Sequence, residues 1–373
     1  MRPDGRPDEL RFRFRRAHHR LRRTPSVFKP KHSEDGPGSD IWGTLMHTAV
    51  RNSNKRGSRR PLRSTAHRLG LIGAAMLLAT ACSAAGSSGN VDAAQDLVDS
   101  AGAGQTIKLP AGTTGSLTIT ERHFASPVTI DMAGSNLSKI AIRRSSNVRI
   151  TNGRVTGAGA RDTFGIFIDD SQKVEISNVT VSKFAAGIAV RRSQDVLIAN
   201  NIVTDLIADG IMIASAQRVK VYGNSCSNFH PVPKVFDDAG NMLEDGDHPD
   251  CIQGWSLPDY APTSDLEVVG NRGFGNFQGV FLNNPMPGGG GYDRVVVTDN
   301  QMQIGWYHGI YMEDGRDVLI TRNSVSGTGA RDIRGKVFDR PIRPYITVSG
   351  GRNVKACGNT VADFPDGVGT ARC

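Results

Sequence analysis

The sequence has no apolar run long enough to cross a membrane comfortably. The one candidate, residues 69–78, falls well short of the length that a spanning helix needs. Five cysteines are present, but no Cys-x-x-Cys pair and no Cys/His cluster occurs, so a zinc site is not indicated. An EF-hand loop and a Gly-Gly-x-Gly-x-Asp calcium repeat are also lacking. We therefore expect no metal cofactor; the alternative is calcium bound by the carboxylates of Asp237, Asp238, Asp245 and Asp247.

Positive charge is concentrated in the first part of the chain. The whole sequence has 45 Lys and Arg against 36 Asp and Glu, a formal net charge of +9. Residues 1–82 contain 18 of these basic residues and only 6 of the acidic ones. The remainder therefore has 27 basic and 30 acidic residues, a net charge of −3. This domain has no basic surplus that would indicate a nucleic acid as its partner.

Residues 46–82 have the pattern of an export signal. A basic segment precedes the apolar run, and three small residues followed by Cys82 come after it. Residues 78–82 resemble a bacterial lipobox, except that Ala79 occupies the position where leucine is preferred. We expect export, with either lipidation at Cys82 or ordinary cleavage before it. The protein would then be periplasmic, an outer-membrane lipoprotein or secreted, and a lipid at Cys82 would be its only membrane contact.

Composition suggests the remaining boundaries. Residues 1–45 are polar and Arg-rich and have no apolar period, so we expect a disordered extension, or an untranslated one if Met46 is the true start. Residues 83–90 are rich in Ser and Gly and read as a flexible tether. Residues 91–373 are expected to form one domain, which we expect to be monomeric.

Four cysteines lie within this domain, namely Cys226, Cys251, Cys357 and Cys373. An even number in an exported domain suggests disulfides. Three pairings are possible, and proximity in sequence favours Cys226–Cys251 together with Cys357–Cys373. The first would close a long insertion, and the second would hold the C-terminus.

A block of 22–23 residues repeats along the domain. Gly-Ile pairs begin at residues 165, 187 and 210, and each is followed by a second apolar strand and an Asn-rich turn. Several short strands at a fixed period, with no helix in the repeat, are typical of a β-solenoid. One Asn per coil follows the second strand, and we expect these residues to form a stacked turn ladder: Asn152, Asn178, Asn201, Asn224, Asn271, Asn300, Asn323 and Asn359.

The start of the domain adds a family resemblance. Residues 91–100 have helical spacing, and residues 106–113 (TIKLPAGT) read as a strand and a turn. This segment resembles the N-terminal cap of right-handed parallel β-helix proteins, the pectate-lyase-like superfamily, and the resemblance continues to about residue 370. We therefore predict an all-β fold, a single-stranded right-handed parallel β-helix of about ten coils with a short N-terminal capping helix.

In such a fold, residues one coil apart stack at about 4.8 Å, the usual spacing between strands. The column before each Gly-Ile pair would contain Phe164, Ala186, Asp209, Asp250, Gln278, His308 and Pro344. The middle of this column is polar, and two adjacent carboxyl groups can push their pKa values apart, leaving one as acid and one as base. Insertions at 229–249, 285–292 and 328–344 flank the same face, which suggests a cleft there.

The outward positions of the same strands suggest a sugar-binding surface. Aromatic rings can receive the apolar faces of sugars, and fixed polar groups can bind their hydroxyls. An ordinary solvated sheet face is the alternative. The predicted substrate-binding residues are Arg191, Gln253, Trp255, Phe281, Asn283, Glu313 and Arg331.

His248-Pro249-Asp250 ends one insertion and opens a strand, and Pro249 restricts His248 to extended backbone. The segment resembles the Asp-Pro-His segment of mannuronan C5-epimerases and related lyases, in reversed order. A capped turn without catalytic function is the alternative. Polygalacturonases are partly similar at Asp209-Gly210, Asp250-Cys251 and His308-Gly309, but their doubled Asp and their Arg-Ile-Lys are missing here.

These resemblances imply an exported enzyme that acts on a uronate-containing polysaccharide by β-elimination or C5-epimerisation. Either reaction needs a base, an acid and a group that neutralises the carboxylate. His248 or His308 would be the base and Tyr311 the acid, while Arg191 or Arg331 would neutralise the carboxylate. The alternatives are a glycoside hydrolase that uses Asp209 and Asp250, and a non-catalytic envelope protein that binds glycan.

Overall fold

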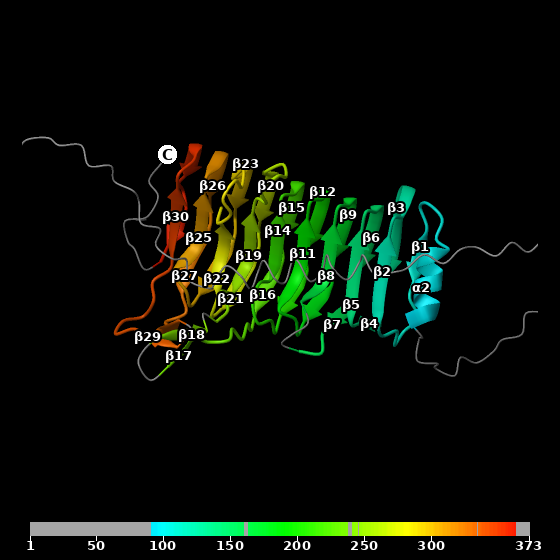
Figure 1. Ribbon diagram of the computed structural model, residues 1–373, viewed down its shortest axis with the longest axis horizontal. Coiled ribbons are helices and arrows are strands. Elements are labelled where there is room, and N and C mark those ends of the chain that lie inside the picture. Colours follow the sequence, from blue (N-terminus) through cyan, green and yellow to red (C-terminus); the bar gives the residue numbers. More distant parts are fainter. Residues whose placement is uncertain (1–90, 160–162, 238–240, 245, 334, 363–373) are drawn as a thin grey trace, which may run out of the picture. The chain divides into compact units, whose positions relative to one another are not determined.

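The computed structural model describes residues 91–159, 163–237, 241–244, 246–333 and 335–362. Figure 1 shows their strands side by side in one long stack, with a short helix at one end. Three parallel sheets run along the stack, and each turn of the chain adds one strand to each sheet. The predicted cap, Cα spacing and period are thus those of a parallel β-helix, and the prediction of an all-β right-handed solenoid is confirmed.

We call the three sheets A, B and C. The strands of sheet A are, in spatial order, β1 (Thr106–Lys108), β3 (His123–Asp131), β6 (Ser146–Thr151), β9 (Gln172–Ser177), β12 (Gln194–Ala199), β15 (Gln217–Tyr222), β20 (Thr263–Val269), β23 (Tyr292–Thr298), β26 (Gly315–Thr321) and β31 (Arg352–Ala356). The strands of sheet B are β2 (Ser116–Thr120), β5 (Lys139–Arg143), β8 (Phe164–Asp169), β11 (Ala186–Arg191), β14 (Ile211–Ala214), β19 (Asp250–Trp255), β22 (Gln278–Leu282), β25 (His308–Glu313) and β30 (Tyr345–Ser349).

The strands of sheet C are β4 (Asn136–Leu137), β7 (Arg154–Thr156), β10 (Thr180–Ser182), β13 (Ile202–Thr204), β16 (Ser225–Ser227), β21 (Arg272–Gly275), β24 (Gln301–Ile304), β27 (Ser324–Gly327) and β32 (Thr360–Val361). Sheets B and C thus have nine strands each among the described residues, slightly fewer than the ten coils predicted. The prediction counted coils from about residue 106, where β1 adds a strand to sheet A alone.

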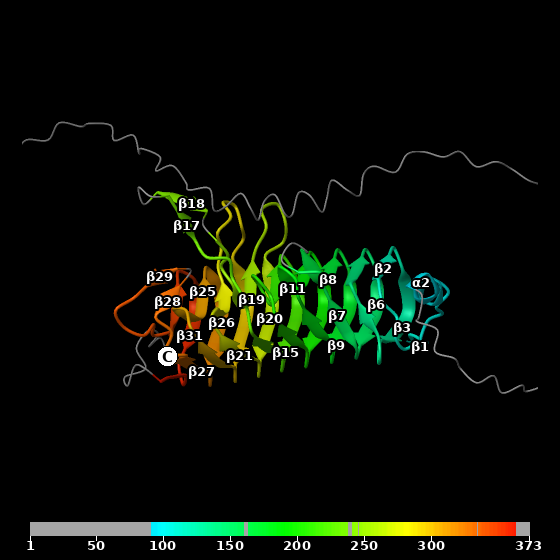
Figure 2. The same ribbon diagram turned by 90° about the horizontal axis from the view of Figure 1, so that it is seen from below.

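Two short antiparallel hairpins interrupt the repeat: β17 (Val235–Phe236) with β18 (Met242–Glu244), and β28 (Asp332–Ile333) with β29 (Lys336–Val337). The first hairpin precedes β19. Figure 2 shows it rising from the stack on the same side as the loops that follow β19 and β22, while Figure 1 shows it at the opposite end of those strands. Two of the predicted insertions therefore border the outward face of sheet B.

The core is filled by residues that alternate along the strands. The predicted core position of sheet B is at most 1 % exposed in seven coils, which confirms the alternation; these residues are Ile166, Ile188, Ile211, Ile252, Val280, Ile310 and Ile346. The aliphatic chains stack in columns because parallel pairing places equivalent residues opposite one another in successive strands.

The N-terminal helix α2 (Val91–Asp99) closes the open end of the stack. Ala94 and Val98 are fully buried against the core. The Gln95 amide donates to the carbonyl of Thr118 at 2.8 Å and accepts from the Thr118 N–H at 3.0 Å. Because Thr118 belongs to the first strand of sheet B, these bonds satisfy an edge that could otherwise pair with another chain. The predicted capping helix is confirmed.

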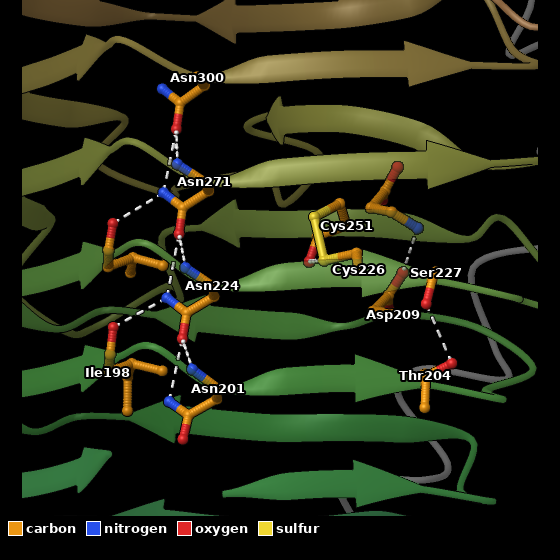
Figure 3. Close-up of a disulfide and its surroundings, with 12 residues drawn as sticks. Ile198, Asn201, Thr204, Asp209, Asn224, Cys226, Ser227, Cys251, Asn271 and Asn300 are labelled. Atoms are coloured by element: carbon orange, nitrogen blue, oxygen red, sulfur yellow. Dashed lines mark hydrogen bonds between the residues drawn. A yellow bond between two sulfur atoms is a disulfide. The ribbon is translucent and has the colours of Figure 1, made fainter. Parts of the chain in front are cut away.

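A ladder of buried asparagines runs along the turn between sheets A and C (Figure 3). The Oδ1 of Asn271, for example, accepts from both the backbone N–H and the side-chain amide of Asn224, at 2.9 and 3.0 Å. The same pattern links each pair of neighbours in the series Asn201, Asn224, Asn271, Asn300, Asn323 and Asn359.

Asn152 and Asn178 were predicted to belong to this ladder, and they do not. Both have positive φ, 60° and 57°, and they align with the preceding turn position. Val179 occupies the ladder position next to Asn178, and its N–H donates to Asn201 at 2.9 Å. The sequence alone did not separate the two positions, because asparagine is favoured both in the left-handed region and in a hydrogen-bonded turn.

Replacing Asn271 with alanine should lower the free energy of unfolding by about 1 to 3 kcal/mol, because buried groups lose their partners. The N–H of Asn224 and the carbonyl of Val221 would both be left without the hydrogen bond that Asn271 makes. Denaturant unfolding would measure the change. The matched control is Asn353→Ala, an exposed asparagine bonded only to Asp317, where a change within about 0.5 kcal/mol is expected. Equal effects of the two substitutions would contradict a stabilising ladder.

One predicted disulfide is present: Cys226 of β16 is bonded to Cys251 of β19, with Cα atoms 5.6 Å apart (Figure 3). It ties sheet C to sheet B and closes the insertion that carries β17 and β18. Cys357 is half-buried, and its predicted partner Cys373 lies outside the described residues, so that pairing stays a prediction. The predicted extension, export signal, Cys82 and tether also lie outside them. No helix of the described part of the chain is long and apolar enough to span a bilayer.

Candidate functional site

A column of polar side chains crosses four adjacent coils on the outward face of sheet B. It consists of Asp209, Asp250, Gln278 and His308, and we call it the polar column. The N–H of Asp250 donates to Asp209 Oδ1 at 3.1 Å, and Asp250 lies opposite Gln278 in the next strand. His308 Nδ1 in turn contacts Gln278 Oε1. Residues separated by up to a hundred positions in the sequence therefore meet, as predicted.

The last member of the predicted column differs. His308 lies opposite Tyr345, whereas Pro344 was expected there. The register shifts between His308 and Ile310, so that β25 holds one extra residue at this point. A β-bulge of this kind cannot be found from the repeat period, because the period gives only the average spacing. The shift replaces a proline with a phenol beside the imidazole.

The two carboxyl groups at the start of the column are fully buried. Burial raises the pKa of both Asp209 and Asp250 well above the usual value, and the nearby charges of Asp247 and Asp209, respectively, raise them further. Asp209 Oδ2 and both carboxyl oxygens of Asp250 make no hydrogen bond. The amide of Gln278 acts in the opposite direction on the pKa of Asp250, but burial is the larger cause. The pair is therefore protonated to a pH above the ordinary range for aspartate.

This protonation predicts how stability depends on pH. A carboxyl group whose pKa is raised by folding binds more protons in the native state, so stability falls as pH rises from its ordinary pKa through its raised one. The double variant Asp209→Asn/Asp250→Asn should remove this fall. At pH 8 its free energy of unfolding should exceed that of the wild type by about 1 to 3 kcal/mol, the cost of buried polar atoms without partners.

Urea unfolding at pH 5 and pH 8 would measure the difference. The control is Asp195→Asn, because the hydrogen bond from Arg218 lowers the pKa of Asp195 and the sign is reversed. That carboxylate stabilises the protein above its ordinary pKa, so its loss should cost stability at both values of pH. A wild-type stability that rises from pH 5 to pH 8 as steeply as that of the double variant would contradict the raised pKa values.

His308 ends the polar column as a neutral base. Burial lowers its pKa to about 4, so the imidazole is uncharged at neutral pH. Gln278 Oε1 can only accept a hydrogen bond, so Nδ1 carries the proton of the neutral ring. Nε2 is then left with its lone pair. This is the form of histidine that can remove a proton from a substrate.

Aromatic rings surround this imidazole. The ring centroids of Phe281 and Tyr311 lie 4.9 and 5.0 Å from that of His308, and they stack on each other at 4.9 Å. Tyr345 meets the imidazole edge-on at 5.4 Å. Burial raises the pKa of Tyr311, which keeps its phenol protonated near neutral pH. A protonated phenol and an unprotonated imidazole therefore lie side by side, flanked by a half-buried aromatic platform.

The other predicted residues of this face lie along the same three strands. Gln253, Phe281, Asn283 and Glu313 are half-buried, and Trp255 is 7 % exposed. Glu313 Oε2 accepts from the N–H of Asn284 at 2.8 Å, which holds the loop after β22. His248 is exposed, and its ring centroid lies 6.3 Å from that of Trp306, so it is not a member of the polar column.

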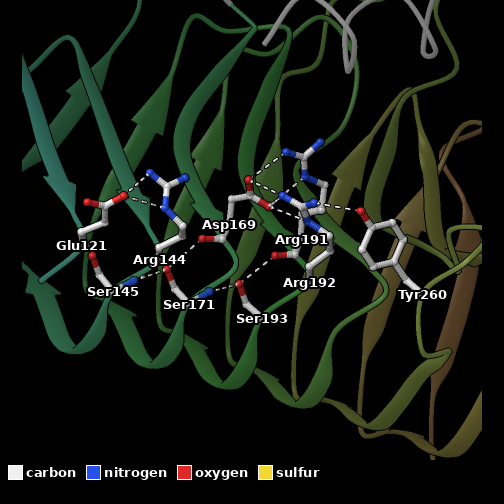
Figure 4. A network of polar contacts seen from close by, with 9 residues as sticks. All are labelled: Glu121, Arg144, Ser145, Asp169, Ser171, Arg191, Arg192, Ser193 and Tyr260. Atoms are coloured by element: carbon white, nitrogen blue, oxygen red, sulfur yellow. Dashed lines mark hydrogen bonds and ion pairs between the residues drawn. The ribbon is translucent and has the colours of Figure 1, made fainter. Parts of the chain in front are cut away.

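Arg191 lies four strands from His308 along sheet B. It is 7 % exposed and forms hydrogen bonds with both carboxylate oxygens of Asp169, at 2.9 and 2.8 Å (Figure 4). Arg192 also binds Asp169, and its guanidinium reaches the hydroxyl of Tyr260 at 3.0 Å. The structure therefore brings Arg191 to a buried ion pair and not to the imidazole.

Arg331 is exposed at the start of the β28–β29 hairpin, and its carbonyl accepts from the N–H of Phe338 at 2.7 Å. The candidate calcium ligands Asp238 and Asp245 lie outside the described residues, so that alternative stays untested. Asp237 binds Asn241, and Asp247 accepts from the N–H of Val232. Among the described residues, no group of three or more His, Cys, Asp or Glu side chains could hold a metal ion.

Sequence reasoning assigned no role to Gln278 and overlooked Tyr345. Gln278 was visible in the column, but only its contact with His308 shows that it selects the tautomer of the imidazole. Tyr345 was hidden by the register shift. The column of residues before each Gly-Ile pair was the signal that could have identified Gln278.

Comparison with known proteins agrees with this architecture. Residues 138–363 match the family model described as right handed beta helix region. The match covers more than half of the chain, so the chain belongs to this family. No curated protein sequence matches the chain.

Solved structures with a related fold are similar at low identity. An endo-xylogalacturonan hydrolase from Aspergillus tubingensis is 16% identical, with a TM-score of 0.43 over 78% of this chain and 97% of that one. An alginate lyase from Paenibacillus sp. is 17% identical, with a TM-score of 0.40 over 72% and 98%. A surface adhesin of Streptococcus pneumoniae is 14% identical, with a TM-score of 0.44 over 66% of this chain and 63% of the adhesin chain.

Proposed function

We propose that this protein is an exported enzyme that acts on a uronate-containing polysaccharide by β-elimination or C5-epimerisation. One observation carries the proposal: the polar column ends on a neutral imidazole that lies beside a protonated phenol. A base and an acid in contact, on an outward face with an aromatic platform, are the groups that either reaction requires.

In this mechanism His308 Nε2 removes the proton at C5 of a uronate residue. The electron pair of the broken C–H bond moves toward the carboxylate, and the resulting anion has two outcomes. In elimination, a C4=C5 double bond forms, the bond from C4 to the glycosidic oxygen breaks, and Tyr311 protonates the leaving oxygen. In epimerisation, Tyr311 returns a proton to C5 from the opposite face.

Gln278 has a positioning role in this proposal. Its carbonyl oxygen holds the Nδ1 proton, which keeps Nε2 free as the base. The buried carboxyl groups of Asp209 and Asp250 lie behind it, with the amide of Gln278 between them and the imidazole.

Glycoside hydrolysis by Asp209 and Asp250 is the second candidate. The contact between the two carboxyl groups and their raised pKa values favour it, because an acid–base pair requires separated protonation states. Their complete burial favours elimination or epimerisation by the partly exposed His308 and Tyr311.

Incubation with a panel of acidic polysaccharides tests these alternatives. Elimination produces unsaturated uronate, which absorbs in the ultraviolet, together with new reducing ends. Epimerisation inverts C5 without cleavage, which NMR detects, and hydrolysis produces reducing ends without unsaturation. Binding without any of these products would leave a non-catalytic glycan-binding protein and end the enzyme proposal.

Export belongs to the same proposal. The Cys226–Cys251 disulfide supports it, because disulfides persist in oxidising compartments. Mass spectrometry of the mature N-terminus would separate lipidation at Cys82 from ordinary cleavage before it. A cytosolic protein that retains residues 46–82 would contradict export.

A further inference from the structure

A cavity of about 560 Å³ lies next to the polar column, at the coil that follows His308. Its aromatic walls are Tyr307, Phe338 and Tyr345, Ile342 packs behind them, and Arg340 and Arg343 supply its charge. We call it the arginine cavity. Its volume is within the range of small-molecule pockets.

The aromatic walls are mutually packed. Tyr307 meets Phe338 edge-on, with ring centroids 5.8 Å apart, and it is stacked near Tyr345 at 6.4 Å. The backbone of the loop is held as well: the N–H of Tyr345 donates to the carbonyl of Tyr307, and that of Ile342 to the carbonyl of Ala330, each at 2.8 Å. Ile342 is only 4 % exposed and anchors the loop in the protein.

Both arginines immediately precede a proline, Pro341 and Pro344. A following proline restricts the backbone of the preceding residue to extended conformations, so each arginine leaves the loop in a defined direction. Both are exposed, and within the described part of the chain neither forms an ion pair. Arginines on sheet A differ in this respect; for example, Arg218 binds Asp195 at 2.6 Å.

The arginine cavity is directly joined to the proposed base. Tyr345 belongs to the cavity wall and also meets the imidazole of His308 edge-on, at 89°. The two residues lie opposite each other in neighbouring strands, which are about 4.8 Å apart. A sugar placed on Tyr345 would therefore adjoin the sugar whose proton faces His308.

We infer that the arginine cavity is a subsite that binds the carboxylate of the uronate residue adjacent to the reacting one. The inference rests on the proposed function for the position of the reacting sugar. The guanidinium groups of Arg340 and Arg343 match a carboxylate in charge and in planar two-point geometry. The tyrosine rings receive the apolar face of the same sugar. The polysaccharide then runs along the stack of coils, with consecutive acidic residues on consecutive strands.

Binding measurements test this subsite apart from turnover. The ligands are oligouronates of defined length and the same oligosaccharides with their carboxyl groups reduced to alcohols. Titration calorimetry is done in a Tyr311→Phe background, so that turnover does not consume the ligand. We expect the acidic ligands to bind, the reduced ligands to bind at least tenfold more weakly, and each of Arg340→Gln and Arg343→Gln to weaken only the acidic ligands, by about tenfold.

The matched control is Arg352→Gln, an exposed arginine on β31 of sheet A, which should leave binding unchanged. Unchanged affinity in both cavity variants, or equal affinity for reduced ligands, would overturn the subsite. Equal weakening by all three arginine variants would also overturn it, since that result indicates a general charge effect. Arginine-dependent binding without products from any acidic polysaccharide would remove the proposed reaction and keep the subsite. Turnover that does not depend on Arg340 and Arg343 would do the reverse.

Discussion

Replacing His308 with alanine should lower turnover on the acidic polysaccharide about 10²–10⁴-fold, the usual contribution of a general base. Substrate affinity should change far less, because the aromatic residues Phe281 and Tyr345 remain in place. Initial rates and calorimetric binding on the same variant would separate the two quantities. The control is His230→Ala, an exposed histidine that contacts Asp205 and lies in another loop.

The pH profile distinguishes this role from a structural one. The base must be unprotonated, and burial lowers the pKa of His308 to about 4, so activity should persist as pH falls and be lost only near pH 4. A solvent-exposed histidine would lose activity near pH 6.5 instead. Gln278→Met removes the acceptor that holds the Nδ1 proton, so it should lower the rate while leaving affinity in place. Wild-type rates in His308→Ala would remove His308 from the mechanism.

Removing the Cys226–Cys251 disulfide should cost about 3 to 4 kcal/mol of unfolding free energy, because the bond closes a loop with a sequence separation of 25 residues. In the chain-entropy model, the loss comes from the larger freedom of the unfolded chain. The double variant Cys226→Ser/Cys251→Ser, compared with the wild type in urea, would measure it. The polar column should also be affected, since Cys251 directly follows Asp250 in β19.

Chemical reduction of the wild type provides the control. Reduced wild type and the double variant should have nearly the same unfolding midpoint, both below that of the oxidised protein. The variant should also lose activity at a lower urea concentration. Equal midpoints for the oxidised wild type and the double variant would show that the disulfide does not stabilise the fold.

The fold could be predicted from the sequence because the repeat is local and periodic. A 22–23-residue period, apolar alternation in each strand and one asparagine per turn are properties of single coils. Parallel pairing converts that period into columns, so the alignment of Gly-Ile pairs placed Asp209, Asp250, Gln278 and His308 on one face. The same logic identified Cys226 and Cys251 as partners.

The alignment failed where a coil departed from the average. The extra residue between His308 and Ile310 brought Tyr345 rather than Pro344 to the imidazole. The Asn152 and Asn178 positions were also misassigned, by a single residue, because both turn positions accept asparagine. A shift of one residue changes the face to which a side chain points, so small errors in register have large effects on a proposed site.

The amino-acid sequence thus established the solenoid, its N-terminal cap, its first disulfide and the membership of the polar column, since each depends on spacing along the chain. The chemical state of that column was decided by tertiary structure. Burial protonates the Asp209 and Asp250 carboxyl groups, neutralises His308 and leaves Arg191 paired with Asp169, while the loop before β30 places Arg340 and Arg343 in a cavity. Desolvation and loop conformation arise from contacts between distant segments, and no repeat period carries that information.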